Sequence, residues 1–257
     1  MRRTDPRHII CLDTRRTMLI SIRREVLFTK AVSIFAALVV LAISLMQFAS
    51  TVRFIDFFYL IDKFNATSAR LPQVLDEYAR ASEVIYVQDY CRSDILNAGL
   101  GIVLADLDHK NPDRDFDSWL GAIKRAETLT QHAMDCAPTV SDYWTRYAMI
   151  RQAAGEQPAE LAKLLAQAVA LDPASISALR ARFALWRKVS QETLEEARPA
   201  LMSDLKTLLA YAGPPAVREV LKGSGDALHP FIGEAFSQLP TERQARLARW
   251  KATPDQL

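Results

Sequence analysis

The longest apolar stretch of the chain covers residues 31–52, where 22 consecutive positions carry no charge. Lys30 and Arg53 bound this stretch. A helix rises about 1.5 Å per residue, so the segment would reach about 33 Å, enough for a hydrocarbon core of about 30 Å. Neither glycine nor proline interrupts it, so a helix would satisfy its backbone groups within lipid. The pattern predicts a transmembrane helix over 31–52.

An aromatic and aliphatic cluster, from Phe54 to Leu60, follows this apolar stretch directly. Aromatic rings concentrate at the boundary between lipid and water, so the cluster predicts an interfacial segment. Residues 65–68 are the first linker-like residues after it. We therefore expect residues 53–70 to combine an interfacial aromatic stretch with a linker, and residues 71–257 to form a separate domain.

The charges are distributed unevenly between the N-terminal segment and the rest. Residues 1–30 carry eight basic and three acidic side chains, a net charge of +5, whereas the remainder has a net charge of −3. By the positive-inside rule, residues 1–30 form a basic cytoplasmic segment and the C-terminal domain is periplasmic, which predicts a single-pass protein of the bacterial inner membrane. Residues 1–24 are expected to lack regular structure. Met18 is an alternative start that keeps enough basic residues for the same orientation.

Three alternative interpretations of the N-terminal region are less favoured. A buried helix of a soluble core rarely contains 22 consecutive uncharged residues. A cleaved secretory signal would have a shorter apolar stretch and small residues before a cleavage site, and neither is present. Nucleic-acid binding by the basic segment would need interleaved aromatic residues or a known motif. The sequence therefore predicts a lipid bilayer as the partner of this region, and no nucleic acid.

Beyond residue 71, apolar residues recur at helical spacing over 72–86, 95–107 and 119–134. Between the last two, residues 106–117 contain five aspartates and predict a polar loop that ends by capping a helix. A short helix is expected over 231–239, and Thr241 with Gln244 predicts a capping box for a last one. Half of the residues are apolar and only eight are glycine, which excludes disorder and glycine-rich phosphate sites. The fold class predicted is all-α.

A repeat lies in the middle of this domain. Two sets of residues share the same spacings, and their prolines are 35 positions apart: Ala126, Thr130, Ala133, Met134 and Pro138, then Leu161, Leu165, Ala168, Val169 and Pro173. This resembles a tetratricopeptide repeat (TPR), whose period is near 34 residues. The resemblance covers about 119–211, with a third, degraded copy in which Pro199 interrupts the middle. It implies antiparallel helical hairpins with a concave surface for a peptide or partner protein. An irregular helical bundle is the alternative.

Three cysteines occur, Cys11 before the apolar stretch and Cys91 and Cys136 after it. In an oxidising periplasm two thiols of one domain rarely stay reduced, so Cys91 and Cys136 are predicted to form a disulfide. Two buried free thiols are the alternative. No CxxC motif or nearby histidine pair accompanies either cysteine, so no metal site is predicted there.

No arrangement of catalytic residues is apparent in the sequence. His132 is expected on a charged, solvated helix face, and His229 in a turn or beside a helix N-terminus. The aspartates of 106–117 fail as an EF-hand, because Phe116 stands where glycine is required in one register and Ser118 in the other. The sequence therefore predicts no enzyme activity, no catalytic residue, no metal and no cofactor.

Aromatic and basic residues suggest a binding surface instead. Its candidate members lie on two predicted helices: Tyr143, Trp144, Tyr147, Arg151 and Trp186. At these spacings aromatic residues are also typical of packing between hairpins. Arg180, Arg182 and Arg187 are interpreted as an ordinary charged outer face.

These features predict a membrane-anchored periplasmic interaction or scaffold protein. The layout resembles single-pass bacterial envelope proteins that accompany surface-polysaccharide assembly, which implies a protein partner in the envelope. One alternative is an envelope glycan-acting enzyme that uses carboxylates such as Asp113 and Asp117. Another is a transmembrane signalling protein with residues 1–30 as its cytoplasmic part. The sequence does not specify an oligomeric state.

Overall fold

The computed structural model describes the backbone of residues 7–66 and 72–254, and the side chains of residues 30–63 and 72–254. Helices account for all regular structure within these ranges, and they contain no strand, which confirms the all-α fold class. Contacts divide the chain into two compact units, Met1–Asp56 and Phe57–Leu257. We call the second unit the helical body.

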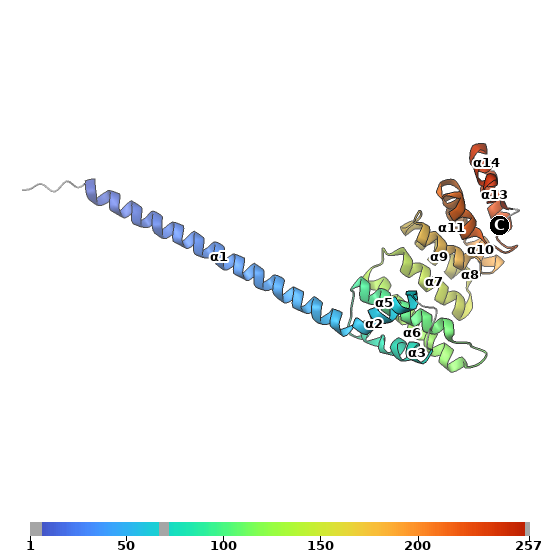
Figure 1. Cartoon of the computed structure of the whole chain (residues 1–257), viewed down its shortest axis with the longest axis horizontal. Coiled ribbons are helices and arrows are strands. Elements are labelled where there is room, and N and C mark those ends of the chain that lie inside the picture. The colour runs from blue at the N-terminus through green and yellow to red at the C-terminus, as the bar shows by residue number, and fades with distance from the viewer. Residues whose placement is uncertain (1–6, 67–71, 255–257) are drawn as a thin grey trace, which may run out of the picture. The chain divides into compact units, whose positions relative to one another are not determined.

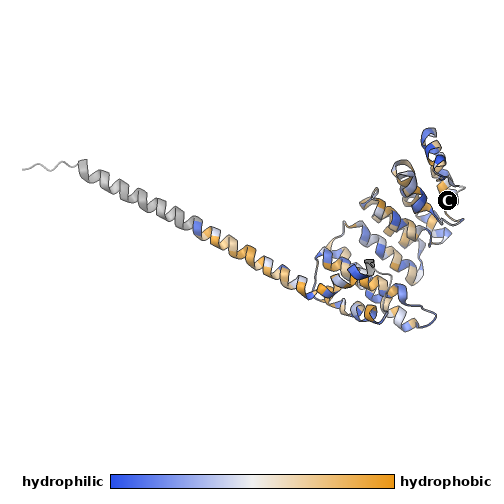
Figure 2. Cartoon of the chain, in the orientation of Figure 1, coloured by the Kyte–Doolittle hydropathy of each residue, from blue (hydrophilic) through white to orange (hydrophobic). Residues whose placement is uncertain are grey.

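The first unit consists mainly of α1 (Arg7–Arg53). Its segment Lys30–Arg53 has a mean hydropathy of 2.4 and buries none of its most apolar window, and Figure 2 shows it as a continuous hydrophobic helix. The segment is long and apolar enough to cross a membrane, a property that signal sequences share. Because α1 begins at Arg7, the expectation that residues 1–24 lack regular structure is wrong for those that are described.

The aromatic stretch predicted at the interface continues into α2 (Ile55–Ala66). Phe57 is only 6% exposed, and its ring meets that of Tyr78 edge-on, with centroids 5.6 Å apart. A Cβ added to Gly101 would lie 2.7 Å from the Cδ1 of Ile61, so α2 packs closely on the helix that contains Gly101. Part of this stretch therefore belongs to the core of the helical body, because its apolar face packs against other helices of the same chain. The linker residues Thr67 and Ser68 lie outside the described residues.

The single helix expected over 72–86 is divided into α3 (Pro72–Ala81) and α4 (Glu83–Val87). Ser82 separates them, and its buried hydroxyl donates to the carbonyl oxygen of Ala79 at 2.6 Å. Such a bond offers the backbone an alternative to continuing the helix.

Two long helices follow, α5 (Ser93–His109) and α6 (Phe116–Cys136). The predicted polar loop is shorter than expected, because Asp106 and Asp108 belong to α5. Its capping role is confirmed: the side chain of Asp115 accepts a hydrogen bond of 3.0 Å from the backbone N–H of Ser118 at the start of α6.

The second hairpin is formed by α7 (Ser141–Gly155) and α8 (Pro158–Leu171). The Ser141 hydroxyl donates to the Ala168 carbonyl oxygen at 2.8 Å and ties the start of α7 to the end of α8. Ala148 and Leu161 are fully buried in the core that these helices share with the C-terminal ones. Consecutive helices contact each other from α5 to α8, and Figure 1 shows the rest of the body extending from α8 to the C-terminal end.

The third segment contains α9 (Ile176–Trp186), α10 (Gln191–Glu196) and α11 (Arg198–Tyr211). Pro199 lies in the first turn of α11, where its missing N–H is tolerated, so the chain breaks before it at Ala197. One hydrophobic core runs from Ala148 to Ala252. It also includes side chains of α12 (Pro214–Leu221), α13 (His229–Ser237) and α14 (Thr241–Arg249).

The capping box predicted for the last helix is wrong. The N-cap of α14 is Pro240, so Thr241 lies inside the helix and makes no capping bond. Gln244 turns back instead, and its amide nitrogen donates to the carbonyl oxygen of Leu239 at 2.9 Å. The Leu239 carbonyl oxygen, just before the helix, thus accepts the hydrogen bond of the Gln244 side chain that a capping box would have used.

Candidate functional site

The disulfide between Cys91 and Cys136 joins the segment between α4 and α5 to the last residue of α6, as the sequence predicts. Their Cα atoms are 5.3 Å apart, within the usual range for a bridge. Cys91 is exposed and Cys136 is half-buried. The bridge closes a long loop that contains α5 and most of α6.

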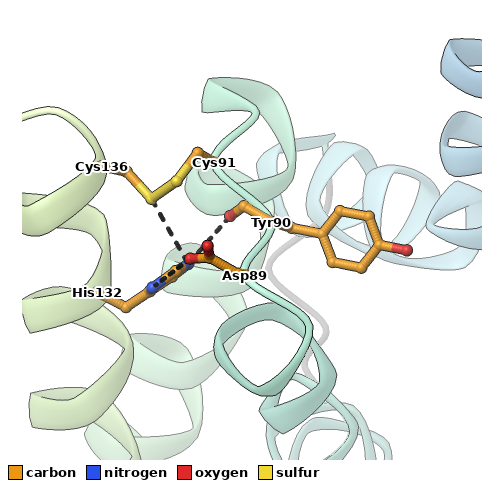
Figure 3. The surroundings of a disulfide bond; sticks show 5 residues. All are labelled: Asp89, Tyr90, Cys91, His132 and Cys136. Atoms are coloured by element: carbon orange, nitrogen blue, oxygen red, sulfur yellow. Dashed lines mark hydrogen bonds and ion pairs between the residues drawn. A yellow bond between two sulfur atoms is a disulfide. The ribbon is translucent and has the colours of Figure 1, made fainter.

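His132 lies one helical turn before Cys136 and faces the disulfide (Figure 3). Its Nε2 is 3.6 Å from the Sγ of Cys136 and 3.1 Å from the carbonyl oxygen of Tyr90. Since a carbonyl can only accept, this geometry requires the proton of a neutral imidazole on Nε2. The side chain is 13% exposed, so the expectation of a solvated His132 is wrong: α6 turns that face toward the loop before α5.

Asp89 places its carboxylate next to His132 and the disulfide. Its carboxylate is 3.9 Å from His132 Nδ1, and its side chain is 88% exposed. Asp89 has a φ of 54°, a left-handed backbone conformation that aspartate tolerates better than most residues. That turn directs the chain from α4 into Tyr90 and Cys91, and in Figure 3 the Tyr90 ring points away from the sulfurs. We call Asp89, Cys91, His132 and Cys136 the disulfide cluster.

The disulfide cluster was only half visible in the sequence. The number and compartment of the cysteines predict their pairing, whereas the sequence pattern predicts a solvated His132 and gives no signal for Asp89. The i, i+4 spacing of His132 and Cys136 on one predicted helix was the available signal, because such residues share a helix face. Nothing in the local sequence showed that Asp89 would approach that face.

A second polar group lies between α3, α5 and α6. Asp106 is 1% exposed and pairs with Arg125 at 3.0 Å and with Lys110 at 3.5 Å. Lys110 also donates to Asp76 at 2.8 Å. That hydrogen bond, with the positive charges of Lys110 and Arg80, holds the pKa of Asp76 below its ordinary value despite partial burial. The ion pairs join three helices and leave the carboxylates engaged with protein cations.

The remaining aspartates of this region are placed apart from that group. Asp113 is exposed in the loop, where its backbone N–H donates to the side-chain oxygen of Asn111 at 2.8 Å. Asp117 is exposed in the first turn of α6. The geometry of Asp113 and Asp117 adds nothing in favour of a glycan-acting enzyme.

The candidate binding surface is divided by the structure. Tyr143 and Trp186 are 1% and 0% exposed, which removes both from any surface. Trp144 is half-buried and donates from its indole nitrogen to the Pro138 carbonyl oxygen at 2.8 Å. Tyr147 is half-buried and accepts from Gln131 at 2.8 Å. Helix packing therefore uses most of the aromatic area that the sequence offered for binding.

Arg151 links three helices through its ion pairs and is not a free cation. It donates to Glu127 of α6 at 2.7 Å and pairs with Glu160 of α8 at 3.0 Å. The hydrogen bonds that Arg151 donates to these carboxylates raise its pKa above the ordinary value. The side chain is 25% exposed, so it contributes to the surface while its charge is already compensated.

The expectation of a charged outer face is wrong for Arg182 and correct for Arg180 and Arg187, which are exposed. Arg182 is fully buried and bonded to Asp204. Arg180 pairs with Glu219 at 2.9 Å, and Arg187 donates to the Lys222 carbonyl oxygen at 2.8 Å. The Arg182 bond connects α9 with α11, and the Arg180 bond connects α9 with α12. The Arg187 bond connects the residue after α9 with the residue after α12.

A small cavity of about 250 Å³ lies against α9, α11 and the start of α12. Its wall is mostly apolar and includes Ile176, Leu179 and Ala216. Tyr211, which also lines it, is 86% exposed. The sequence gives no signal for Tyr211, because one tyrosine at a helix end adds nothing to a periodic pattern.

Comparison with known proteins adds no assignment: no protein-family description, curated protein or solved structure matches the chain. The fold and the described geometry define an all-helical protein with an N-terminal apolar helix and one disulfide.

Proposed function

We propose that this chain is a single-pass protein of the bacterial inner membrane whose helical body lies in the periplasm and binds a protein partner of the cell envelope. The observation that carries the proposal is the segment Lys30–Arg53, an apolar helix that buries none of its most apolar window within the protein. An exposed surface of this kind is stable only where lipid or another protein covers it.

Charge and redox chemistry support the same orientation. The net charge of +5 in residues 1–30 favours their retention on the cytoplasmic side. The Cys91–Cys136 disulfide lies in the helical body, and disulfides persist mainly in oxidising compartments such as the periplasm. The charge of residues 1–30 and the disulfide of the helical body lie in different parts of the chain, and both favour the same topology.

The successive packing of helical hairpins in the body favours a binding function over a catalytic one. The hairpins α5/α6 and α7/α8 pack in succession, and they carry the 35-residue spacing that resembles TPR proteins. Arrays of this kind present extended surfaces to partner proteins. Tyr211, strongly exposed beside an apolar cavity, is the residue that we expect to contact the partner, since tyrosine is enriched at binding hot spots.

The topology is tested with C-terminal fusions and membrane extraction. An alkaline phosphatase fusion should be active, a green fluorescent protein fusion dark, and the protein should stay in the pellet after carbonate treatment. A bright cytosolic fusion, or release by carbonate, would overturn the proposed location.

The partner is tested by photo-crosslinking in living cells with a reactive amino acid at position 211. The same amino acid at Glu192, an exposed residue of α10, is the matched control. We expect a discrete crosslinked protein at position 211 that is absent at position 192. Equal background at both positions would count against partner binding through Tyr211.

A further inference from the structure

The disulfide cluster brings together four groups that bind metal ions. Asp89 and Cys91 come from the segment between α4 and α5, while His132 and Cys136 lie one turn apart on α6. Each offers one donor atom, and all four donor atoms lie within 4.8 Å of one another. Two helices and one tight turn hold this arrangement, so it does not depend on a flexible tail.

We propose that reduction of the disulfide converts this cluster into a Zn²⁺ site, with the Cys91 and Cys136 thiolates, the His132 imidazole and the Asp89 carboxylate as ligands. Two sulfurs, one nitrogen and one oxygen form a normal tetrahedral zinc set. Thiolates select zinc over Ca²⁺ and Mg²⁺, which prefer oxygen ligands. The proposal concerns chemistry of the chain itself and does not depend on its location or partner.

The chemical balance requires an external reductant of the dithiol class. A dithiol transfers two electrons and two protons to the bridge, which gives two cysteine thiols and an oxidised, disulfide-bonded reductant. Zn²⁺ then displaces both thiol protons and binds the two thiolates. In the oxidised chain the sulfurs are bonded to each other and are not available as thiolates.

The geometry needs only small adjustments to close around a metal. Ligands at about 2.0–2.3 Å from a tetrahedral zinc lie roughly 3.3–3.8 Å apart. Cys136 Sγ and His132 Nε2 already lie 3.6 Å apart. The two sulfurs separate once their bond is cleaved. Cys91 and the side chain of Asp89 are exposed, so both can move toward the metal without disturbing the core.

His132 is already oriented for this role by the surrounding backbone. Nε2 faces Cys136 and the Tyr90 carbonyl oxygen, and it would exchange its proton for the metal when zinc binds. A metal ion would then link α6 to the segment before α5 in the reduced chain, as the disulfide links them in the oxidised chain.

The test uses the full chain in detergent, with Cys11→Ser throughout so that Cys91 and Cys136 supply the only thiols. The protein is reduced, freed of reductant without oxygen and titrated with Co²⁺, whose thiolate charge-transfer absorption reports sulfur ligation. Zn²⁺ is then added as a competitor. We expect one Co²⁺ per reduced chain, full displacement by Zn²⁺, and no absorption from the oxidised chain.

Variants separate the proposed ligands from general surface binding. Cys91→Ser with Cys136→Ser should abolish the absorption, and His132→Ala should weaken Zn²⁺ binding by roughly tenfold or more. His229→Ala, at an exposed histidine of α13, is the matched control and should bind like the parent. Circular dichroism of each variant checks that the helices are retained, and His132→Gln provides a second variant if His132→Ala unfolds.

Two results would overturn the proposal. One is a reduced chain that binds Co²⁺ and Zn²⁺ no more tightly than the double serine variant. The other is folded His132→Ala and His132→Gln proteins that bind zinc as tightly as the parent.

Discussion

Arg182 of α9 and Asp204 of α11 form a doubly hydrogen-bonded ion pair inside the core of the helical body. The Nε and Nη2 atoms of Arg182 each donate to a different carboxylate oxygen at 2.8 Å, and both side chains are 0% exposed. The indole nitrogen of Trp186 donates to the same carboxylate at 3.0 Å. Asp204 thus accepts hydrogen bonds from three buried nitrogen atoms of two α9 residues.

We predict that Asp204→Ala lowers the free energy of unfolding by about 3–5 kcal/mol, because it leaves the Arg182 charge buried without a partner. Urea denaturation of the purified chain measures the change. Glu219→Ala removes the partner of Arg180 in an exposed pair and should cost less than about 1 kcal/mol. Similar losses for both variants would contradict the special role of the buried pair.

We predict opposite effects of alanine at two helical glycines. A Cβ at Gly99 of α5 would lie 2.4 Å from Ile85 Cδ1 and 3.3 Å from Leu129 Cδ2, and both of these side chains are fully buried. Gly99→Ala should therefore destabilise by about 1–3 kcal/mol through overpacking. At Gly233 of α13 no atom lies within 4 Å, so Gly233→Ala should stabilise by about 0.5–1 kcal/mol through helix propensity. Thermal or urea unfolding that shows equal signs would disprove the close approach of α4, α5 and α6.

We predict that Asp76 makes stability depend on acid pH. The hydrogen bond from Lys110 lowers the pKa of Asp76 in the folded chain below 3.8, so the ionised form stabilises the fold. This contribution is fully present above the unfolded pKa and is lost as the pH falls through the folded value. Asp76→Asn should flatten the fall in unfolding free energy between about pH 5 and 2.

The control for the pH experiment is Asp113→Asn, which alters an exposed aspartate in the loop before α6. It should leave the pH profile of urea denaturation close to that of the parent. If Asp76→Asn and Asp113→Asn gave the same profile, the Lys110–Asp76 hydrogen bond would not be the cause of the acid sensitivity.

We predict that thiol labelling of the unreduced, denatured chain modifies Cys11 alone, and that reduction exposes Cys91 and Cys136. Mass spectrometry of the labelled peptides distinguishes the three sites. Replacing Cys91 and Cys136 by alanine should lower the free energy of unfolding by up to about 4 kcal/mol, because the bridge closes a long loop of the unfolded chain. Cys11→Ala is the control, and modification of Cys91 or Cys136 before reduction would disprove the bridge.

The all-helical class followed from the sequence because it depends on local chemistry. The spacing of apolar residues and the scarcity of glycine are properties of short segments, and both were sufficient to locate α5 to α8. The apolar helix before Arg53 was equally visible, since its length and lack of charge need no tertiary contact. The cysteine pair followed from the number and separation of the cysteines.

Local patterns were insufficient wherever a polar residue met a partner distant in sequence. Arg182, interpreted as surface, is buried because Asp204 lies opposite it across the α9–α11 contact. Tyr143 and Trp186 fill the core for a related reason, since helical periodicity gives the face of a residue but not what covers that face. His132 approaches Cys91 and Asp89 only because α6 packs beside the segment that precedes α5. The segments of the helical body were thus encoded locally, whereas the grouping of charges, aromatics and metal-binding atoms required helix packing, which joins residues that no short window contains.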